Sequence, residues 1–202
     1  MTLPFDGPLL VATHNAGKLD EMRALLAPLG VTVEGARDHN LPEPDETGTT
    51  FVENARIKAH AAAQATGRTA LADDSGIVID ALDGQPGVYT ADWATTAEGT
   101  RDFTMAMTRA HDLLLASGVP EPWTCRFCAT LVLARPDGTD QVFEGAVPGT
   151  FSWPPRGEIG HGYDPIFVPD GHDLTFGQMS TDQKNTLSHR ARALQALIAA
   201  LS

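Results

Sequence analysis

The chain has 202 residues, a formal net charge of −12 and 42% hydrophobic residues. A chain of this size and composition can bury a real core, which argues against wholesale disorder. The acidic balance argues against a protein that coats DNA or RNA or docks on an anionic membrane, because both need clustered Lys and Arg. No apolar run is long enough to span a bilayer, and the first residues lack the pattern of a secretory signal, so we expect a cytoplasmic protein.

The positive charge is unevenly divided between the two basic residue types. Of 14 basic residues 11 are Arg, and the three lysines are Lys18, Lys58 and Lys184. A lysine ammonium is a compact point charge, whereas the guanidinium of Arg is a planar fork with five donors. Chance explains the scarcity of lysine unless the three positions share a function.

The first third of the chain predicts a βαβ unit. Residues 8–12 form an apolar run, the polar loop 13–18 follows, and a helical pattern then extends to Gly30. Residues 31–33 are typical of a second strand, which would pair in parallel with the first. After an acidic, Pro-rich loop at residues 36–48, Thr50 and Glu53 form a capping box that begins an Ala-rich helix. This helix is expected to reach about residue 65 and to end at Gly67.

The rest of the chain predicts an antiparallel part of the sheet. Residues 69–72 and 77–82 are typical of strands, with an interruption at residues 73–76, and residues 100–116 are typical of a helix. Two further strands, at 124–134 and 141–147, flank the hairpin signal Pro136-Asp137-Gly138. A short strand at 166–168 and a final helix from Ser180, capped with Gln183, complete the pattern. We predict one α/β domain over residues 1–202, with a mixed sheet in two lobes around a cleft.

The loop before the first helix is a candidate phosphate site. Its backbone N–H groups, the helix dipole and Lys18 would all attract an anion. The loop matches neither the P-loop nor the dinucleotide glycine pattern, and a turn without a ligand is the simpler interpretation.

Asp73 and Asp74 are adjacent carboxylates at the end of a strand-like run, where open α/β sheets bind ligands. Adjacent strand residues point to opposite faces, so only one should face a given cleft, and we expect the other to hydrogen-bond locally or to cap. One of these carboxylates with Glu46 would suit a Mg²⁺ ion held mainly by substrate phosphates. An Asx-turn beside a solvated acidic loop is the alternative.

The segment Gly160-His161-Gly162-Tyr163-Asp164-Pro165 is rich in glycine and aromatic residues. Its glycines would let the backbone approach a ligand, and His161 or Tyr163 could stack on a base. A tight turn with a packed Tyr explains the same residues.

Lys184, Ser188, His189 and Arg190 lie near the start of the last helix. Lys184 and Arg190 could reach one ligand only if the helix breaks near Leu187 or Ser188. A solvated basic face is otherwise the favoured interpretation.

Cys125 and Cys128 have the spacing of a metal or redox pair, but they lie in a strand-like segment where residues three apart face opposite ways. The sequence has no second cysteine pair to complete a zinc site. We therefore expect two buried, reduced thiols.

Five segments in order match one family: ATHNAGK, ETGTTFVENARIKA, ALADDSGIVIDALDGQPGVYTADWA, GHGYDPIFVP and DQKNTLSHRARAL. Together, over residues 9–194, they resemble the inosine triphosphate pyrophosphatase family. The resemblance implies an elongated mixed β-sheet with flanking helices, two lobes around a deep substrate cleft, and a homodimer. It also implies Mg²⁺-dependent hydrolysis of ITP, dITP and XTP to the monophosphate and pyrophosphate, which keeps these nucleotides out of DNA and RNA.

The resemblance further implies roles for individual residues. Asp74 corresponds to the general base and to a metal-linked carboxylate, and Glu46 corresponds to the metal partner of Asp74. The substrate-binding residues that the resemblance implies are Thr13, His14, Asn15, Ala16, Gly17, Lys18, Lys58, Ser75, His161, Gly162, Tyr163, Asp164, Lys184, His189 and Arg190. All three lysines fall in matched motifs, which favours a shared function over chance.

Two positions depart from the family pattern. His161 stands where the family usually has Phe, and a histidine can stack but also changes charge near neutral pH. Asp92 stands where a basic residue is frequent, so no role is carried over to it.

Two other functions stay open at this point. The same carboxylates would serve a different Mg²⁺ phosphohydrolase, which would release orthophosphate first. A nucleotide-binding module without catalysis would bind ITP and not turn it over.

Overall fold

The structure is a computed structural model that describes residues 7–201. Residues 1–6, which bear on the expected lack of a secretory signal, lie outside the described residues. The chain divides into two compact units. The first unit comprises Met1–Asp74, Ala129–Gly145 and Arg190–Ser202, and the second comprises Ser75–Cys128 and Ala146–His189.

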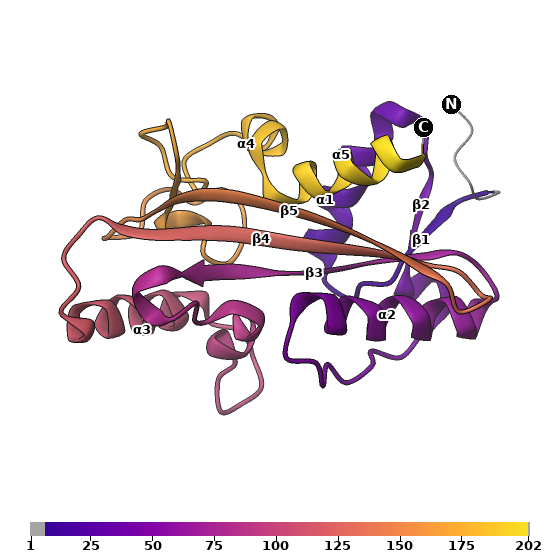
Figure 1. The fold of residues 1–202 in the computed structure, drawn as a ribbon, viewed down its shortest axis with the longest axis horizontal. Coiled ribbons are helices and arrows are strands. Elements are labelled where there is room, and N and C mark those ends of the chain that lie inside the picture. Colours follow the sequence, from indigo (N-terminus) through magenta and orange to yellow (C-terminus); the bar gives the residue numbers. More distant parts are fainter. Residues whose placement is uncertain (1–6, 202) are drawn as a thin grey trace. The chain divides into compact units, whose positions relative to one another are not determined.

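One six-stranded sheet has the order β2-β1-β3-β4-β5-β6 (Figure 1). Its strands are β1 (Leu9–Val11), β2 (Val33–Gly35), β3 (Ala70–Ile79), β4 (Trp123–Ala134), β5 (Asp140–Phe151) and β6 (Phe167–Pro169). The α-helices are α1 (Ala16–Leu26), α2 (Phe51–Thr66), α3 (Phe103–Ser117), α4 (Thr181–Leu187) and α5 (His189–Leu201). β1 pairs in parallel with β2 and β3, whereas β6 runs antiparallel to β5. The predicted mixed α/β sheet and its βαβ unit are confirmed.

In the first unit, the alternation of side chains along the strands divides the core into two layers. Leu9 and Val11 of β1 face α1 and α5, which cover one face of the sheet (Figure 1). Leu10 and Ala12 face the opposite way, toward α2. The buried face of α2 consists largely of alanines, whose small side chains let the helix lie close to the strands: Ala55, Ala59, Ala62 and Ala63.

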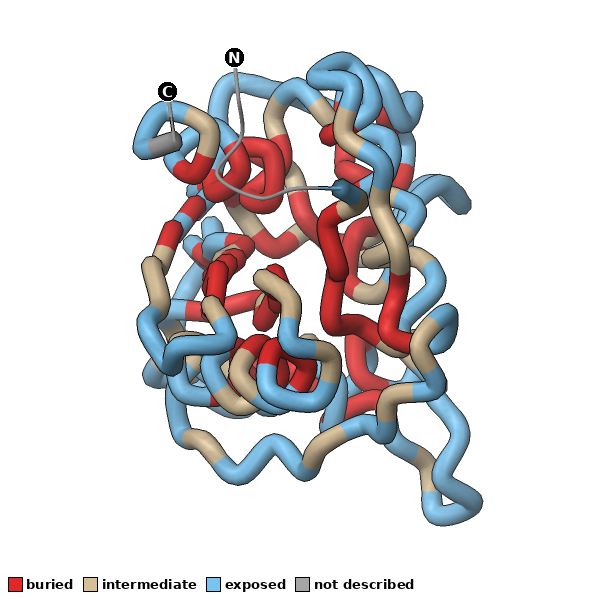
Figure 2. Tube along the Cα trace, turned by 90° about the vertical axis from the view of Figure 1, so that its right-hand side faces the viewer, coloured by how far each residue is buried: buried red, intermediate tan, exposed pale blue. Residues whose placement is uncertain are grey.

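In the second unit, aromatic side chains form most of the core. Phe127 of β4 contacts Phe167 of β6 at a centroid distance of 4.6 Å, and it stacks on His189 at 4.9 Å. The buried side of α3 packs against the same cluster through Ala106, Met107, Ala110 and Leu114. Along both units, the buried stretches of the trace are the strands and the inward sides of the helices (Figure 2).

The predicted interruption of the strand at residues 73–76 is wrong, because β3 runs unbroken from Ala70 to Ile79. The backbone N–H of Ile77 donates to Thr90 Oγ1 at 3.0 Å, which holds the strand to the following loop. A Cβ atom at Gly76 would overlap Thr90 Oγ1 and the carbonyl oxygen of Gly87. Gly76 therefore permits a close approach of the loop and does not end the strand.

The final helix is also not continuous. α4 ends at Leu187, Ser188 is extended (φ −62°, ψ 155°), and α5 begins at His189. This break lies at Ser188, between Lys184 and Arg190. It is the break in the helix that the sequence requires if both side chains are to reach one ligand. The two segments belong to different units, Lys184 to the second and Arg190 to the first.

Three smaller features complete the comparison with the sequence. β2 begins at Val33 rather than at residue 31. Cys125 is buried but Cys128 is only half-buried, and no disulfide joins them, so the prediction of two buried thiols holds for Cys125 alone. Within residues 7–201, no helix combines the length and the apolar character needed to cross a membrane.

The layered core of the first unit predicts the effect of a cavity. Leu131 is fully buried between the strands and helices α1 and α5, so Leu131→Ala should lower the free energy of unfolding by about 2–5 kcal/mol. Leu115 on α3 is 59% exposed, and Leu115→Ala should change the free energy of unfolding by no more than about 0.5 kcal/mol. Urea unfolding of the two variants measures both values, and equal losses would contradict this description of the core.

Candidate active site

Asp73 and Asp74 point to opposite faces of β3, as the alternation of strand residues requires. On one face, Asp73 forms an ion pair with Lys18 Nζ at 2.9 Å and accepts a hydrogen bond from Arg190 Nε at 2.8 Å. On the other face, Asp74 accepts Lys58 Nζ at 2.9 Å. The expectation that one of the two carboxylates would only hydrogen-bond locally is wrong, because Arg190 comes from the far end of the chain.

The first face holds a closed network of two cations and two carboxylates. Arg190 also donates to Glu21 Oε2 at 2.5 Å, so α1, β3 and α5 are joined through one guanidinium. Burial by itself would raise the pKa of the Asp73 carboxyl. The guanidinium of Arg190 and the ammonium of Lys18 outweigh it and hold that pKa well below the usual range. Asp73 is therefore ionised at all ordinary pH values.

The second face holds two carboxylates and one cation. Lys58 Nζ donates to Glu46 Oε1 at 2.8 Å and to Asp74 Oδ1 at 2.9 Å. Burial and the neighbouring charge of Glu46 raise the pKa of Asp74 above its ordinary value, in spite of the attraction of Lys58. The pKa values of the adjacent Asp73 and Asp74 are thus shifted in opposite directions, as is typical of sites where one carboxyl is a proton acceptor and the other a fixed charge.

The start of α1 carries the loop predicted to bind phosphate. Asn15 caps the helix by accepting the backbone N–H of Lys18 at 3.1 Å, and Asn15 N donates to Thr13 Oγ1 at 3.2 Å. His14 is bonded through its ring to the carbonyl oxygen of Leu41 at 2.8 Å. Ala16 and Gly17 form the first turn, so their N–H groups lie at the positive end of the helix dipole.

The carboxylates of the second face fit a magnesium ion that shares its coordination with phosphate. Asp74 Oδ2 is buried and lacks a hydrogen-bond partner among residues 7–201, so this carboxylate has capacity for another ligand. No cluster of three or more His, Cys, Asp or Glu residues that could hold a metal occurs in the described part of the chain. Two carboxylates without a complete protein cage are what Mg²⁺ needs when phosphates supply the other ligands.

The predicted residues of the second unit gather around Asp164. Its Oδ2 atom accepts Lys184 Nζ at 2.7 Å and the backbone N–H of His161 at 2.6 Å. Tyr163 is buried and contacts Phe103 edge-on at 6.0 Å, and burial raises the pKa of its hydroxyl. Of the two stacking candidates, the ring of Tyr163 thus packs in the core, while His161 is exposed.

The three lysines do share a feature, because each forms an ion pair with an aspartate of a predicted motif. Lys18 and Lys58 pair with the adjacent Asp73 and Asp74 in the first unit, and Lys184 pairs with Asp164 in the second. The second unit also contains Ser75, which is half-buried on β3, Gly162 in the loop around Asp164, and the buried His189.

Asp73 and Glu21 act as partners of the buried cations, and no role as partner was predicted for either of them. Glu21 lies three residues after Lys18 on the same helical face, a spacing that brings side chains together. This spacing was the signal in the sequence that could have placed Glu21 near Lys18. The contact of Glu21 with Arg190 could not be inferred, since 169 residues separate the two.

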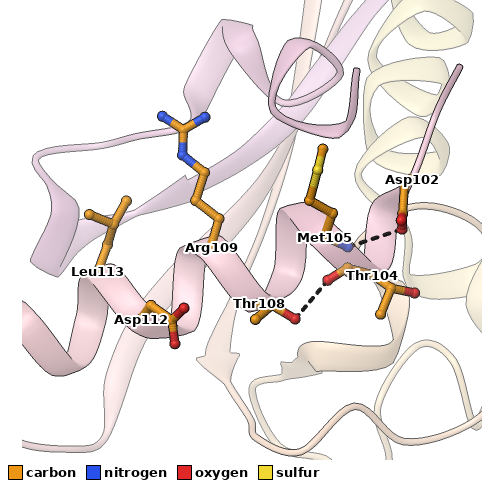
Figure 3. Close-up of a pocket in the computed structure, with 7 residues that line it drawn as sticks. All are labelled: Asp102, Thr104, Met105, Thr108, Arg109, Asp112 and Leu113. Carbon is orange, nitrogen blue, oxygen red and sulfur yellow. Dashed lines mark hydrogen bonds between the residues drawn. The ribbon is translucent and has the colours of Figure 1, made fainter. Parts of the chain in front are cut away.

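A separate surface depression of about 620 Å³ follows α3 (Figure 3). The N-cap Asp102 and one side of the helix line it, with Thr104, Met105, Thr108, Arg109, Asp112 and Leu113. None of the predicted site residues contributes to this lining, and nearly all of it comes from one helix. We therefore place the candidate active site at β3 and not at this depression.

The chain is an α/β protein with a mixed sheet and buried charged residues on both faces of β3. The chain belongs to the Ham1 family, whose model matches residues 9–200. This confirms the resemblance to inosine triphosphate pyrophosphatases noted from the sequence.

Named relatives cover almost the whole chain. A dITP/XTP pyrophosphatase of Ruegeria pomeroyi is 64% identical over 199 residues, which are 98% of this chain and 97% of the relative. A dITP/XTP pyrophosphatase of Agrobacterium fabrum is 55% identical, with 94% of each chain covered. The solved structure of a HAM1 protein from Coxiella burnetii is 34% identical and superposes with a TM-score of 0.87, covering 96% of this chain and 98% of that one.

The opposite pKa shifts of the adjacent aspartates predict that their substitutions change the stability of the fold by different amounts. The lowered pKa of Asp73 means that its ionised form stabilises the fold above pH 4, and this contribution is lost as the pH falls through the folded-state value. The raised pKa of Asp74 means that its ionised form costs stability at neutral pH. At pH 7, Asp73→Asn should therefore cost about 3–5 kcal/mol, because it leaves buried cations uncompensated. Asp74→Asn should lower the free energy of unfolding by much less, because Lys58 keeps Glu46 as a partner and burial already disfavours the ionised form of Asp74.

Thermal unfolding of the two variants at pH 7 compares the same isosteric change at neighbouring positions. A loss for Asp74→Asn as large as that for Asp73→Asn would show that the two carboxylates do not differ in this way.

Proposed function

We propose that this chain hydrolyses the non-canonical purine nucleoside triphosphates ITP, dITP and XTP to the monophosphate and pyrophosphate. The observation that carries the proposal is the pair Asp73 and Asp74, with opposite pKa shifts and a lysine on each. Relatives named dITP/XTP pyrophosphatase, 51–64% identical over most of the chain, support the substrate class. Such an enzyme would remove these nucleotides before they enter DNA or RNA.

Asp74 is the proposed general base. Its raised pKa makes it a better proton acceptor than an ordinary aspartate, and its Oδ2 atom has no partner among the described residues. In the proposed step, Asp74 accepts a proton from the water that attacks the α-phosphorus. A bond forms from the water oxygen to this phosphorus, and the bond to the bridging oxygen breaks, so that pyrophosphate leaves.

Mg²⁺ is the proposed cofactor, with Glu46 and Asp74 as its protein ligands. When bound, it would neutralise charge on the triphosphate and stabilise charge in the transition state. Lys18 and Lys58 are proposed to add positive charge near the phosphates, together with the N–H groups of residues 13–18. Asp73 acts through Lys18 and Arg190, which it holds in place on its face of the strand.

Base recognition is proposed for the second unit. Hypoxanthine and xanthine present an acceptor oxygen at the 6-position, where adenine presents an amino donor. A pocket of donors would reject adenine, because the donors would be left buried and unpaired. The exposed His161 is proposed to stack on the base, and His189 and Arg190 to bind substrate.

Two further properties stay predictions from the sequence, a homodimer and a cytoplasmic location. The loop from Tyr89 to Trp93 is a candidate dimer contact, in which Tyr89 is 50% exposed whereas Trp93 is buried. The contact would therefore involve Tyr89 and not Trp93.

A product-resolved assay tests the proposed reaction. With Mg²⁺, the protein should release pyrophosphate from dITP, ITP and XTP, and turnover of ATP should be lower by several orders of magnitude, since a donor pocket leaves its groups unpaired with adenine. Orthophosphate as the first product would favour a different phosphohydrolase. Binding of ITP without turnover would favour a binding module, and equal rates with ATP and dITP would contradict the proposed specificity.

Substitutions at the carboxylates test the assigned roles. Asp74→Asn should lower kcat about 10²–10⁴-fold, because it removes the proton acceptor. Because a protonated Asp74 cannot accept the proton, kcat of the unmodified protein should fall at acid pH. Steady-state kinetics from pH 4 to 9 measure both effects. Asp80→Asn is a matched control at an exposed aspartate of the second unit, and it should leave kcat unchanged. Unchanged kcat in Asp74→Asn would remove this residue from catalysis.

A further inference from the structure

We propose that Lys58 is an internal counter-cation, whose ammonium holds Glu46 and Asp74 together until a divalent metal ion displaces it. The inference deepens the proposed function by stating how the metal site is maintained before metal and nucleotide bind. It rests on the proposed function only in its last step, in which the displaced ammonium turns to the substrate phosphates.

The contacts of Lys58 are those of a bridging cation. Its Nζ atom lies 2.8 Å from Glu46 Oε1 and 2.9 Å from Asp74 Oδ1, so one ammonium joins both carboxylates. The two carboxylates come from different segments, an exposed loop and a buried strand, and Lys58 donates a hydrogen bond to each of them. Without a cation between them, the like charges would repel.

The position of Lys58 is built into α2. The capping box of Thr50 and Glu53 fixes the first turn of the helix, and Lys58 emerges from the buried face farther along. Lys58 is 8% exposed and Asp74 is 5% exposed, so water screens the attraction between their charges poorly. A buried ammonium in this place is stable only because it has both carboxylates as partners.

The ammonium and a metal ion would compete for the same two carboxylates. A divalent ion bound to Glu46 and Asp74 would lie close to the ammonium of Lys58, and the two positive charges would repel in this poorly screened environment. Metal binding therefore requires the ammonium to leave its bridging position. The flexible side chain of lysine, with its four-carbon stem, permits that movement within the helix as it stands.

Lys18 provides a contrast on the opposite face of the same strand. Its Nζ atom also lies 2.9 Å from an aspartate, but Asp73 has Arg190 as a second cation. Removal of Lys18 therefore leaves Asp73 compensated and leaves Glu46 and Asp74 bridged by Lys58. The two lysines form a matched pair for an experiment.

The experiment measures binding of Mn²⁺, a spectroscopic substitute for Mg²⁺, to the full-length protein without nucleotide. Electron paramagnetic resonance of unbound Mn²⁺ gives the dissociation constant for the unmodified protein, Lys58→Met and Lys18→Met. Lys58→Met should bind Mn²⁺ about tenfold more tightly or better, because the competing charge is gone. Lys18→Met should stay within about threefold of the unmodified protein, since its ammonium lies on the other face.

A second readout follows the folded state. Without metal, Lys58→Met should unfold at a lower temperature than the unmodified protein, and Mn²⁺ should raise its Tm by a larger increment. If Lys58→Met does not fold, Lys58→Gln serves instead, because its amide keeps hydrogen bonding to the carboxylates without the charge.

Equal or weaker Mn²⁺ binding in the Lys58 variants would overturn the inference, as would an equal gain in Lys18→Met. These results are independent of hydrolysis. Tighter Mn²⁺ binding in a protein that releases no pyrophosphate would overturn the proposed function and leave the counter-cation role standing. Pyrophosphate release together with an unchanged Mn²⁺ affinity in the Lys58 variants would overturn the counter-cation role and leave the proposed function standing.

Discussion

The charged residues of the site depend on one geometric constraint, that adjacent residues of a β-strand face opposite sides of the sheet. Because Asp73 and Asp74 are neighbours on β3, their carboxylates enter two different layers of the first unit. Each layer must then supply its own cations, since a buried carboxylate without a partner is costly. Helices α1 and α5 supply Lys18 and Arg190 on one side, and α2 supplies Lys58 on the other.

The two layers differ in charge balance, and this difference separates their chemistry. On the side of Asp73, cations and carboxylates are equal in number, so the network is neutral and its aspartate is fixed in the ionised form. On the side of Asp74, two carboxylates share one ammonium, which leaves net negative charge. The neutral network stabilises the fold, whereas the negative charge on the side of Asp74 can attract a further cation.

The sequence predicted most elements, because helix caps and hydrophobic periodicity are local signals. The capping boxes at Thr50 and Ser180 mark helix starts that the structure confirms. The continuity of β3 through residues 73–76 was missed, since it depends on Thr90 and on ion pairs with distant residues. For the site, the sequence predicted the opposite orientation of the two aspartates. The partner of Asp73 could not be predicted, because nothing local to a strand residue indicates an arginine 117 positions away.

The scarcity of lysine has a practical consequence. The three lysines of the chain each pair with a different aspartate, and each pair belongs to a motif assigned to substrate or metal. Isotope labelling confined to lysine side chains would therefore give three signals with almost no background from the rest of the surface. Each of the three lysine signals would report on the ionic environment of one aspartate.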